Sequence, residues 1–162
     1  GVVHSDDGRT ERGYVWFPDG TGRLLPDPPA RNGLVATFRP RSIRNGWVTG
    51  ASVRASLGAN GESGAEESTA IRLHLATGRF VALPANDLWP QHGNDQGWAV
   101  GSSSDGRAVL LTDDRVLALP GLTDKRYTTA NIAWRVSDDG RTVSGQSDNA
   151  KGDPQAVRWR CR

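Results

Sequence analysis

The amino-acid sequence predicts an all-β protein made of short antiparallel sheets that repeat along the chain. Three observations lead to this prediction. Twenty Gly and nine Pro among 162 residues require frequent turns. The apolar residues form short runs without the i, i+3, i+4 and i+7 spacing of an amphipathic helix, so we expect minimal helix. Related segments also recur in a constant order, about 45 to 50 residues apart.

Three kinds of segment define the repeat. A G-W-x-x-G-x-S segment, or a related copy, occurs at 46–52, 97–103 and 140–147. An R-x-x-A-L-P segment, or a shorter copy, occurs at 79–84, 115–120 and 23–26. Strand-like apolar runs lie between these anchors at 14–17, 70–75, 108–111 and 156–159. Each complete unit therefore reads as four strands: a lead-in, the glycine strand, the apolar strand and a last strand closed by Pro, which cannot donate to a ladder.

Turn residues agree with this division. Gly in a tight turn supplies left-handed backbone, and such pairs occur at Asp19-Gly20, Asn45-Gly46, Thr77-Gly78, Asp105-Gly106 and Asp139-Gly140. We expect strands near 14–17, 46–51, 70–76, 79–83, 97–102, 107–111, 115–119, 132–136, 142–146 and 155–160. The polar segment 53–68 is expected to be an inserted mobile loop, because it has little apolar surface to bury.

The chain is expected to form a single propeller-type domain or half-propeller over residues 1–162, since the repeat period is typical of propeller blades. Its approximate units are 1–37, 38–85, 86–130 and 131–162. Counting strands gives three, four, four and three, or about three and a half four-stranded blades. Closed rings need at least about four blades, so we expect part of a larger propeller. A small self-closed four-bladed ring is the alternative.

One part of the chain resembles known repeats. Residues 136–147, followed by Ala156-Val157-Arg158-Trp159, resemble the HAF-type extracellular repeats, a propeller-like family. The Ser137-Asp138-Asp139-Gly140-Arg141 turn is similar to the S-x-D-G-R hairpin of WD40-like and TolB-like β-propeller blades. The resemblance implies a propeller fold and names no activity. Residues 5–10 repeat the hexapeptide 137–142 at another place in their unit, which we interpret as recurring turn chemistry.

Several classes of function are disfavoured. Twenty basic and 18 acidic residues are interspersed, which is no nucleic-acid footprint, and no apolar run could span a bilayer. The histidines His4, His74 and His92 lack metal-ligand spacing, and Cys161 is the single cysteine, so we expect no metal. Nucleophile, P-loop and dinucleotide motifs are absent from the sequence, so we expect no cofactor and no catalytic residue. The Asp pairs are expected to cap turns.

The candidate ligand face lies in the two stretches that precede G-W-x-x-G strands. We expect it to contain Trp89, His92, Asn94, Asp95, Arg39 and Arg41, because equivalent positions in neighbouring blades share one rim. Trp89 and His92 are placed in an inter-strand loop, with Trp89 as the most exposed aromatic, and Arg39 and Arg41 are placed in the corresponding loop one unit earlier. Changing Trp89 to Ala should therefore weaken ligand binding and leave thermal stability nearly unchanged.

Two functions remain open. The first is a non-enzymatic recognition module, secreted or at the cell surface, that binds a protein or glycan through the loop face. The second is part of a propeller-type hydrolase or lyase whose active site is shared with another chain segment. In either case we expect a partner, another polypeptide or a fragment of the same precursor, that completes the propeller and covers its sheet edges. Cys161 could form an intermolecular disulfide or pack beside Trp159.

Overall fold

The structure, a computed structural model, describes residues 1–6, 11–30, 34–57, 63–123 and 131–161. Every regular element in these ranges is a β-strand, so the all-β prediction is confirmed. The strands form four antiparallel sheets in which each strand pairs with its neighbours in sequence. The first sheet contains β1 (Val2–His4), β2 (Glu11–Trp16) and β3 (Gly22–Leu24). The second contains β4 (Ala36–Arg44), β5 (Trp47–Leu57), β6 (Ser63–His74) and β7 (Phe80–Asn86).

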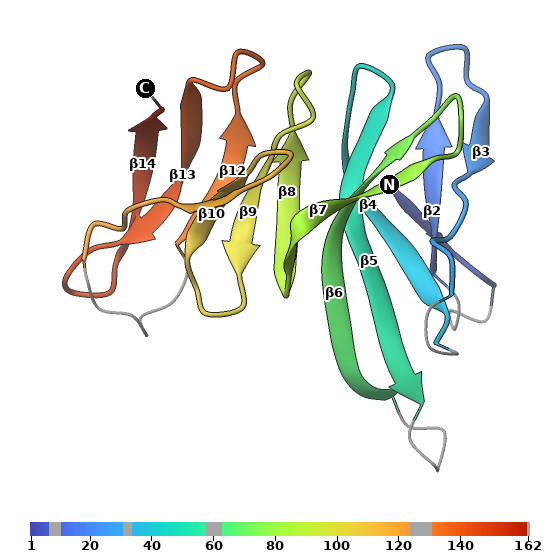
Figure 1. Cartoon of the computed structure of the whole chain (residues 1–162), viewed down its shortest axis with the longest axis horizontal. Coiled ribbons are helices and arrows are strands. Elements are labelled where there is room, and N and C mark those ends of the chain that lie inside the picture. The colour runs from blue at the N-terminus through green and yellow to red at the C-terminus, as the bar shows by residue number, and fades with distance from the viewer. Residues whose placement is uncertain (7–10, 31–33, 58–62, 124–130, 162) are drawn as a thin grey trace.

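The third sheet contains β8 (Leu88–Gly93), β9 (Ala99–Ser103), β10 (Ala108–Leu111) and β11 (Val116–Ala118). The fourth contains β12 (Ile132–Val136), β13 (Thr142–Asp148) and β14 (Pro154–Arg160). The strands of the described residues therefore number three, four, four and three per sheet, as the repeat predicted. Figure 1 shows the sheets side by side in chain order. β4 contacts β2 and β8, and β8 contacts β12.

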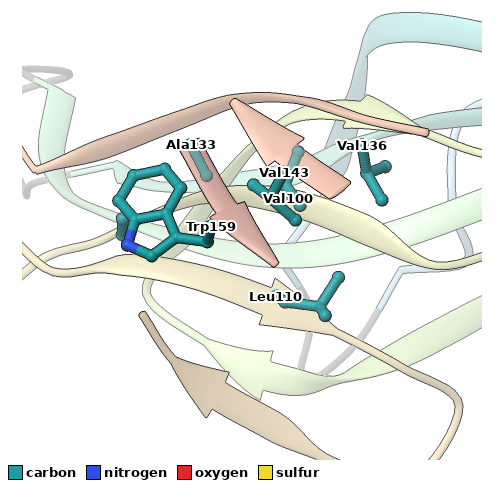
Figure 2. Close-up of a cluster of buried hydrophobic side chains, with 7 residues drawn as sticks. Val100, Leu110, Ala133, Val136, Val143 and Trp159 are labelled. Atoms are coloured by element: carbon teal, nitrogen blue, oxygen red, sulfur yellow. The ribbon is translucent and has the colours of Figure 1, made fainter. Parts of the chain in front are cut away.

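Three apolar clusters fill the spaces between neighbouring sheets. The first and second sheets share Val15, Leu25, Phe38, Val48, Ile71 and Leu73. The second and third share Ala70, Leu83, Leu88, Ala99, Val109 and Leu111. The third and fourth share Val100, Ala108, Leu110, Ala133, Val136, Val143 and Trp159, most of which Figure 2 labels. Because the third sheet is covered on both faces, all four residues of β10 are buried.

The sheets correspond residue by residue. The repeat glycines Gly50, Gly101 and Gly145 pair across the ladder with Ile71, Val109 and Val157. Ile71 and Val109 pair in turn with the Ala of their A-L-P segments. In the first sheet, Tyr14 pairs with Leu24, which like the Ala of A-L-P stands two residues before a Pro. Tyr14 is therefore equivalent to Ile71 and Val109.

Four strands were not among the predicted ranges: β1, β3, β4 and β8. β4 and β8 each contain a Pro, Pro40 and Pro90, which argues against an interior strand position. Each Pro lies at a β-bulge, where the ladder is interrupted and the missing N–H is tolerated. The expectation of a loop over 53–68 is wrong for most of that segment. β5 and β6 continue as a paired hairpin through Ala55↔Glu66 and Leu57↔Ser63, and only residues 58–62 lie outside the described part.

The predicted turn role of the Asp pairs is confirmed at Asp138-Asp139. In the β12–β13 turn, Ser137 Oγ donates to Asp139 Oδ1 at 2.6 Å, and Arg141 N donates to the same oxygen at 3.0 Å. Asp105 makes a hydrogen bond to Ser103 in the β9–β10 turn, which joins a different pair of strands. The S-x-D-G-R pattern therefore forms turns between different pairs of strands. The copy at residues 5–10 lies mostly outside the described residues.

Candidate functional site

The first strands of three sheets, β4, β8 and β12, lie next to one another and share one irregularity. Each has a β-bulge at the same register, so one extra residue stands between two ladder pairs: Arg41, Gln91 and Trp134. A bulge bends its strand and redirects the side chains that follow it. The residues directly after the bulges are Ser42, His92 and Arg135, which pair with Thr49, Val100 and Ser144.

The repeat glycines make this geometry feasible. A Cβ on Gly50 would overlap Arg39 O, one on Gly101 would overlap Trp89 O, and one on Gly145 would overlap Ile132 O. Each overlapping carbonyl belongs to the first strand of the same sheet, two residues before the bulge residue. The second Gly of the G-W-x-x-G pattern is therefore required by close backbone approach.

A pocket of about 510 Å³ opens where the ends of these strands meet the following turns. It is lined by Arg44, His92, Arg135, Val136, Ser137, Asp138, Thr142 and Ser144. Its residues come from three sheets: β4 supplies Arg44, β8 supplies His92, and the fourth sheet supplies the rest. Seven of the eight side chains are polar or charged, so the pocket is suited to a polar ligand.

His92 is the most buried titratable group of the pocket. Its side chain is 4% exposed, and its Nδ1 has no hydrogen-bond partner among the described residues. Burial lowers the pKa of His92 below its usual 6.5, and the nearby guanidinium groups of Arg135 and Arg44 lower it further. The carboxylate of Asp138 acts in the opposite direction. The imidazole is therefore neutral at pH 7, and its Nδ1 is a buried polar atom without a hydrogen-bond partner among the described residues.

The charges around His92 favour a negatively charged group. Arg44 and Arg135 are exposed cations, and Asp138 is an exposed anion, so the pocket has a net charge of one positive unit with His92 neutral. Arginine presents its N–H donors in a planar fork that matches a carboxylate. The lining of the pocket therefore has an excess of positive charge.

The structure distributes the six predicted ligand residues over several environments. Trp89 and His92 lie on β8, and Arg39 and Arg41 lie on β4, so their placement in loops is wrong. Trp89 is half-buried, which also contradicts its expected exposure. Only His92 lines the pocket.

The other predicted residues make separate contacts. Arg39 forms an ion pair with Glu11 at 3.4 Å, toward the first sheet. Arg41 lines a different pocket of about 220 Å³ between the first two sheets. Buried Asn94 accepts from Gln96 N at 3.1 Å and from Trp98 N at 2.9 Å, and its Nδ2 donates to Ser137 O at 3.1 Å. Asn94 therefore links the third and fourth sheets. Asp95 is exposed in the turn that follows β8.

Sequence reasoning missed Arg44, Arg135, Asp138 and Ser144. Arg135 could have been found by aligning the lead-in strands on the glycines that follow them. That alignment places W-P-Q-H of the third unit on I-A-W-R of the fourth, and so His92 on Arg135. Arg44 ends its strand directly before the Asn45-Gly46 turn, in the arginine-containing stretch 39–44.

Comparisons with protein-family models, curated proteins and solved structures found no match. In the described part of the chain, no group of three or more His, Cys, Asp or Glu side chains is arranged to hold a metal ion. The described residues also contain no helix of the length and hydrophobicity needed to cross a membrane. Cys161 is a free cysteine, and it packs against the cluster that contains Trp159.

Proposed function

We propose that this chain is a non-enzymatic recognition module with propeller-like blades, which binds a glycan or a protein at the rim formed by the ends of β4, β8 and β12. The pocket around His92 is the observation that carries the proposal. It combines a buried ring nitrogen without a partner with two exposed arginines in its lining, and it draws on three sheets. Turns from neighbouring sheets converge there, which is a usual arrangement for binding surfaces on rigid β scaffolds.

A binding role is favoured over the alternative of a shared hydrolase or lyase site. General acid–base catalysis on a nucleophile needs a base within hydrogen-bond reach of the group that it activates. Nδ1 of His92 has no such partner in the described part of the chain. The resemblance to extracellular repeats supports a secreted or cell-surface location, which we include in the proposal.

The experiment is a binding screen with labelled protein on a glycan array and a protein array. The wild-type chain is compared with an R44A/R135A double variant and with R158A, which removes one exposed arginine outside the pocket. We expect a defined set of ligands that the wild type and R158A bind and the double variant does not. Equal binding by all three proteins, or no ligand on either array, would refute the proposal. Turnover of a bound ligand would favour the enzymatic alternative.

We further propose that another sheet packs on the outer face of the first sheet. Tyr14 is equivalent to Ile71, Val109 and Val157, and the residues two positions after these three are Leu73, Leu111 and Trp159. Each of them packs against the preceding sheet and is at most 8% exposed. In the first sheet the same position is Trp16, which is 57% exposed, and Leu24 beside it is 46% exposed. An apolar face of this kind marks an interaction surface.

The outer face of the fourth sheet differs in chemistry. Leu110, which is buried between the third and fourth sheets, corresponds to exposed Arg158 on β14. A polypeptide that completes a propeller would cover both faces. Native mass spectrometry tests this proposal, because it detects a partner or a higher assembly directly. A monodisperse species of 17.4 kDa whose termini resist proteolysis would refute it and favour a small closed ring.

A further inference from the structure

We propose that the pocket around His92 recognises a carboxylated sugar, with Arg44 and Arg135 holding the carboxylate and the hydroxyl side chains of the pocket contacting the ring hydroxyls. This inference rests on the proposed recognition function and names the class of ligand. Its basis is the charge and the lining of the pocket, taken together with the unpartnered ring nitrogen of His92.

The net charge of the pocket selects the charge of the ligand. Two guanidinium groups face one carboxylate, that of Asp138, so a ligand with a single negative charge neutralises the site. A phosphate monoester, which carries up to two negative charges at pH 7, would leave the site with excess negative charge. A carboxylate has one charge and two coplanar oxygens, which match the N–H fork of arginine.

The remaining lining favours a sugar over an acidic peptide side chain. Thr142 and Ser144 supply hydroxyl groups that can donate and accept, as sugar hydroxyls do. Val136 is the one apolar residue of the lining. His92 adds a buried ring nitrogen whose hydrogen-bonding capacity is unused. A ligand that bears several hydroxyl groups beside its carboxylate can contact the arginines and the hydroxyl side chains of the lining together.

Binding of an anion should couple to protonation of His92. The groups that act on His92 are Arg44 at the end of β4, Arg135 on β12 and Asp138 in the turn after β12. In the free protein, burial and the two arginines keep the pKa of His92 below 6.5. A bound carboxylate counteracts the arginines and raises that pKa. Affinity should therefore increase as the pH falls through the raised pKa, as long as the ligand carboxylate remains ionised.

The probe is sodium glucuronate, titrated into the full chain while the His92 ring protons are followed by NMR. Glucose serves as the neutral match, inorganic phosphate as the dianion, and N-acetyl-aspartate amide as the peptide carboxylate. We expect saturable binding of glucuronate that is tighter at lower pH and stronger than binding of the other three. R135A should weaken it about tenfold or more, the loss expected for a charge-assisted hydrogen bond.

Two further variants separate ligand contact from general electrostatics and from folding. D138N removes the opposing carboxylate and should tighten glucuronate binding, which a merely structural role of this side chain would not do. R158A changes the net charge by the same amount as R135A and lies outside the pocket, so it should leave the affinity unchanged. These readouts use the wild-type His92, so they do not depend on whether a His92 variant folds.

Several outcomes would overturn the inference. If glucose binds as tightly as glucuronate, the carboxylate is not recognised. If the aspartate derivative binds equally or more tightly, the site is one for acidic peptides. If R158A and R135A lower the affinity for glucuronate equally, the effect is one of net charge and not of contact in the pocket. Absence of glucuronate binding together with pocket-dependent binding of neutral glycans on the array would refute this inference and leave the proposed function standing.

Discussion

Arg72 offers a direct test of how neighbouring sheets are held together. It lies on β6 of the second sheet, and its side chain is 14% exposed. Its Nη1 donates to Gly97 O at 2.9 Å and its Nη2 donates to Asp113 Oδ1 at 2.8 Å, both in turns of the third sheet. The guanidinium also lies 4.8 Å from the centre of the Trp47 ring. We predict that Arg72→Ala loosens the contact between these two sheets.

The three contacts of Arg72 differ in strength. The hydrogen bond from a charged donor to the partly buried Gly97 carbonyl is expected to contribute about 1.5–3 kcal/mol. The ion pair contributes about 0–1 kcal/mol, because Asp113 is 67% exposed and solvent screens the pair. The cation–π contact adds about 0.5–1 kcal/mol. Since such terms are not strictly additive, we expect Arg72→Ala to lower the free energy of unfolding by about 2–4 kcal/mol.

Urea denaturation followed by Trp fluorescence measures this effect, with Asp113→Ala as the matched control. Asp113→Ala removes the ion pair alone and should cost no more than about 1 kcal/mol. Arg72→Met keeps most of the side-chain volume and loses all three polar contacts, so it should behave like Arg72→Ala. If Arg72→Ala and Asp113→Ala have the same effect, the Gly97 hydrogen bond contributes little and the argument is wrong.

Three further predictions follow from packing and turn chemistry. Gly101→Ala should cost about 1–3 kcal/mol in urea denaturation, because the new Cβ overlaps Trp89 O, whereas neighbouring Ser102→Ala should have little effect. Trp159→Ala should cost about 3–5 kcal/mol, and Trp16→Ala less than about 1 kcal/mol in the isolated chain; equal losses would contradict the assigned exposures. Hydrogen bonds from Ser137 and Arg141 hold the pKa of Asp139 below its usual 3.8. The ionised Asp139 therefore stabilises the folded state above pH 3.8, and this stabilisation is lost as the pH falls through the lowered pKa. Thermal melts between pH 2 and 6 should therefore show that Asp139→Asn lowers Tm at pH 6 and converges with the wild type at the acid end.

The sequence was sufficient to predict the repeat and most strands, because these depend on local patterns. Gly and Pro mark turns and strand ends by their own backbone restrictions, and the A-L-P and G-x-x-G segments have the same pairing in the second and third sheets. The lead-in strands β4 and β8 escaped prediction for an equally physical reason. Their Pro residues would break a regular ladder, and only pairing with a neighbouring strand shows that a β-bulge accommodates them.

The candidate site was predictable only in part. His92 was chosen from the sequence, although for a loop position that it does not occupy. Arg44 and Arg135 are 91 positions apart in the numbering. Aligning the lead-in strands relates Arg135 to His92, but no such pattern relates Arg44 to either residue. They meet because each lies at or after a bulge in the first strand of its sheet, and because these strands are neighbours. The packing of sheets supplies this information, and a single sequence does not.

The repeat separates residues that maintain the scaffold from residues that define the site. At the bulge, the second Gly of the pattern is the same in three sheets, since any Cβ there would overlap a carbonyl of the neighbouring strand. The position directly after the bulge has no such steric restriction, and it holds Ser42, His92 and Arg135 in turn. Ser42 Oγ accepts from Gly93 N at 2.7 Å and so joins two sheets, whereas His92 and Arg135 face the pocket. One backbone arrangement therefore presents three different side chains along adjacent strands, one that joins two sheets and two that line the pocket.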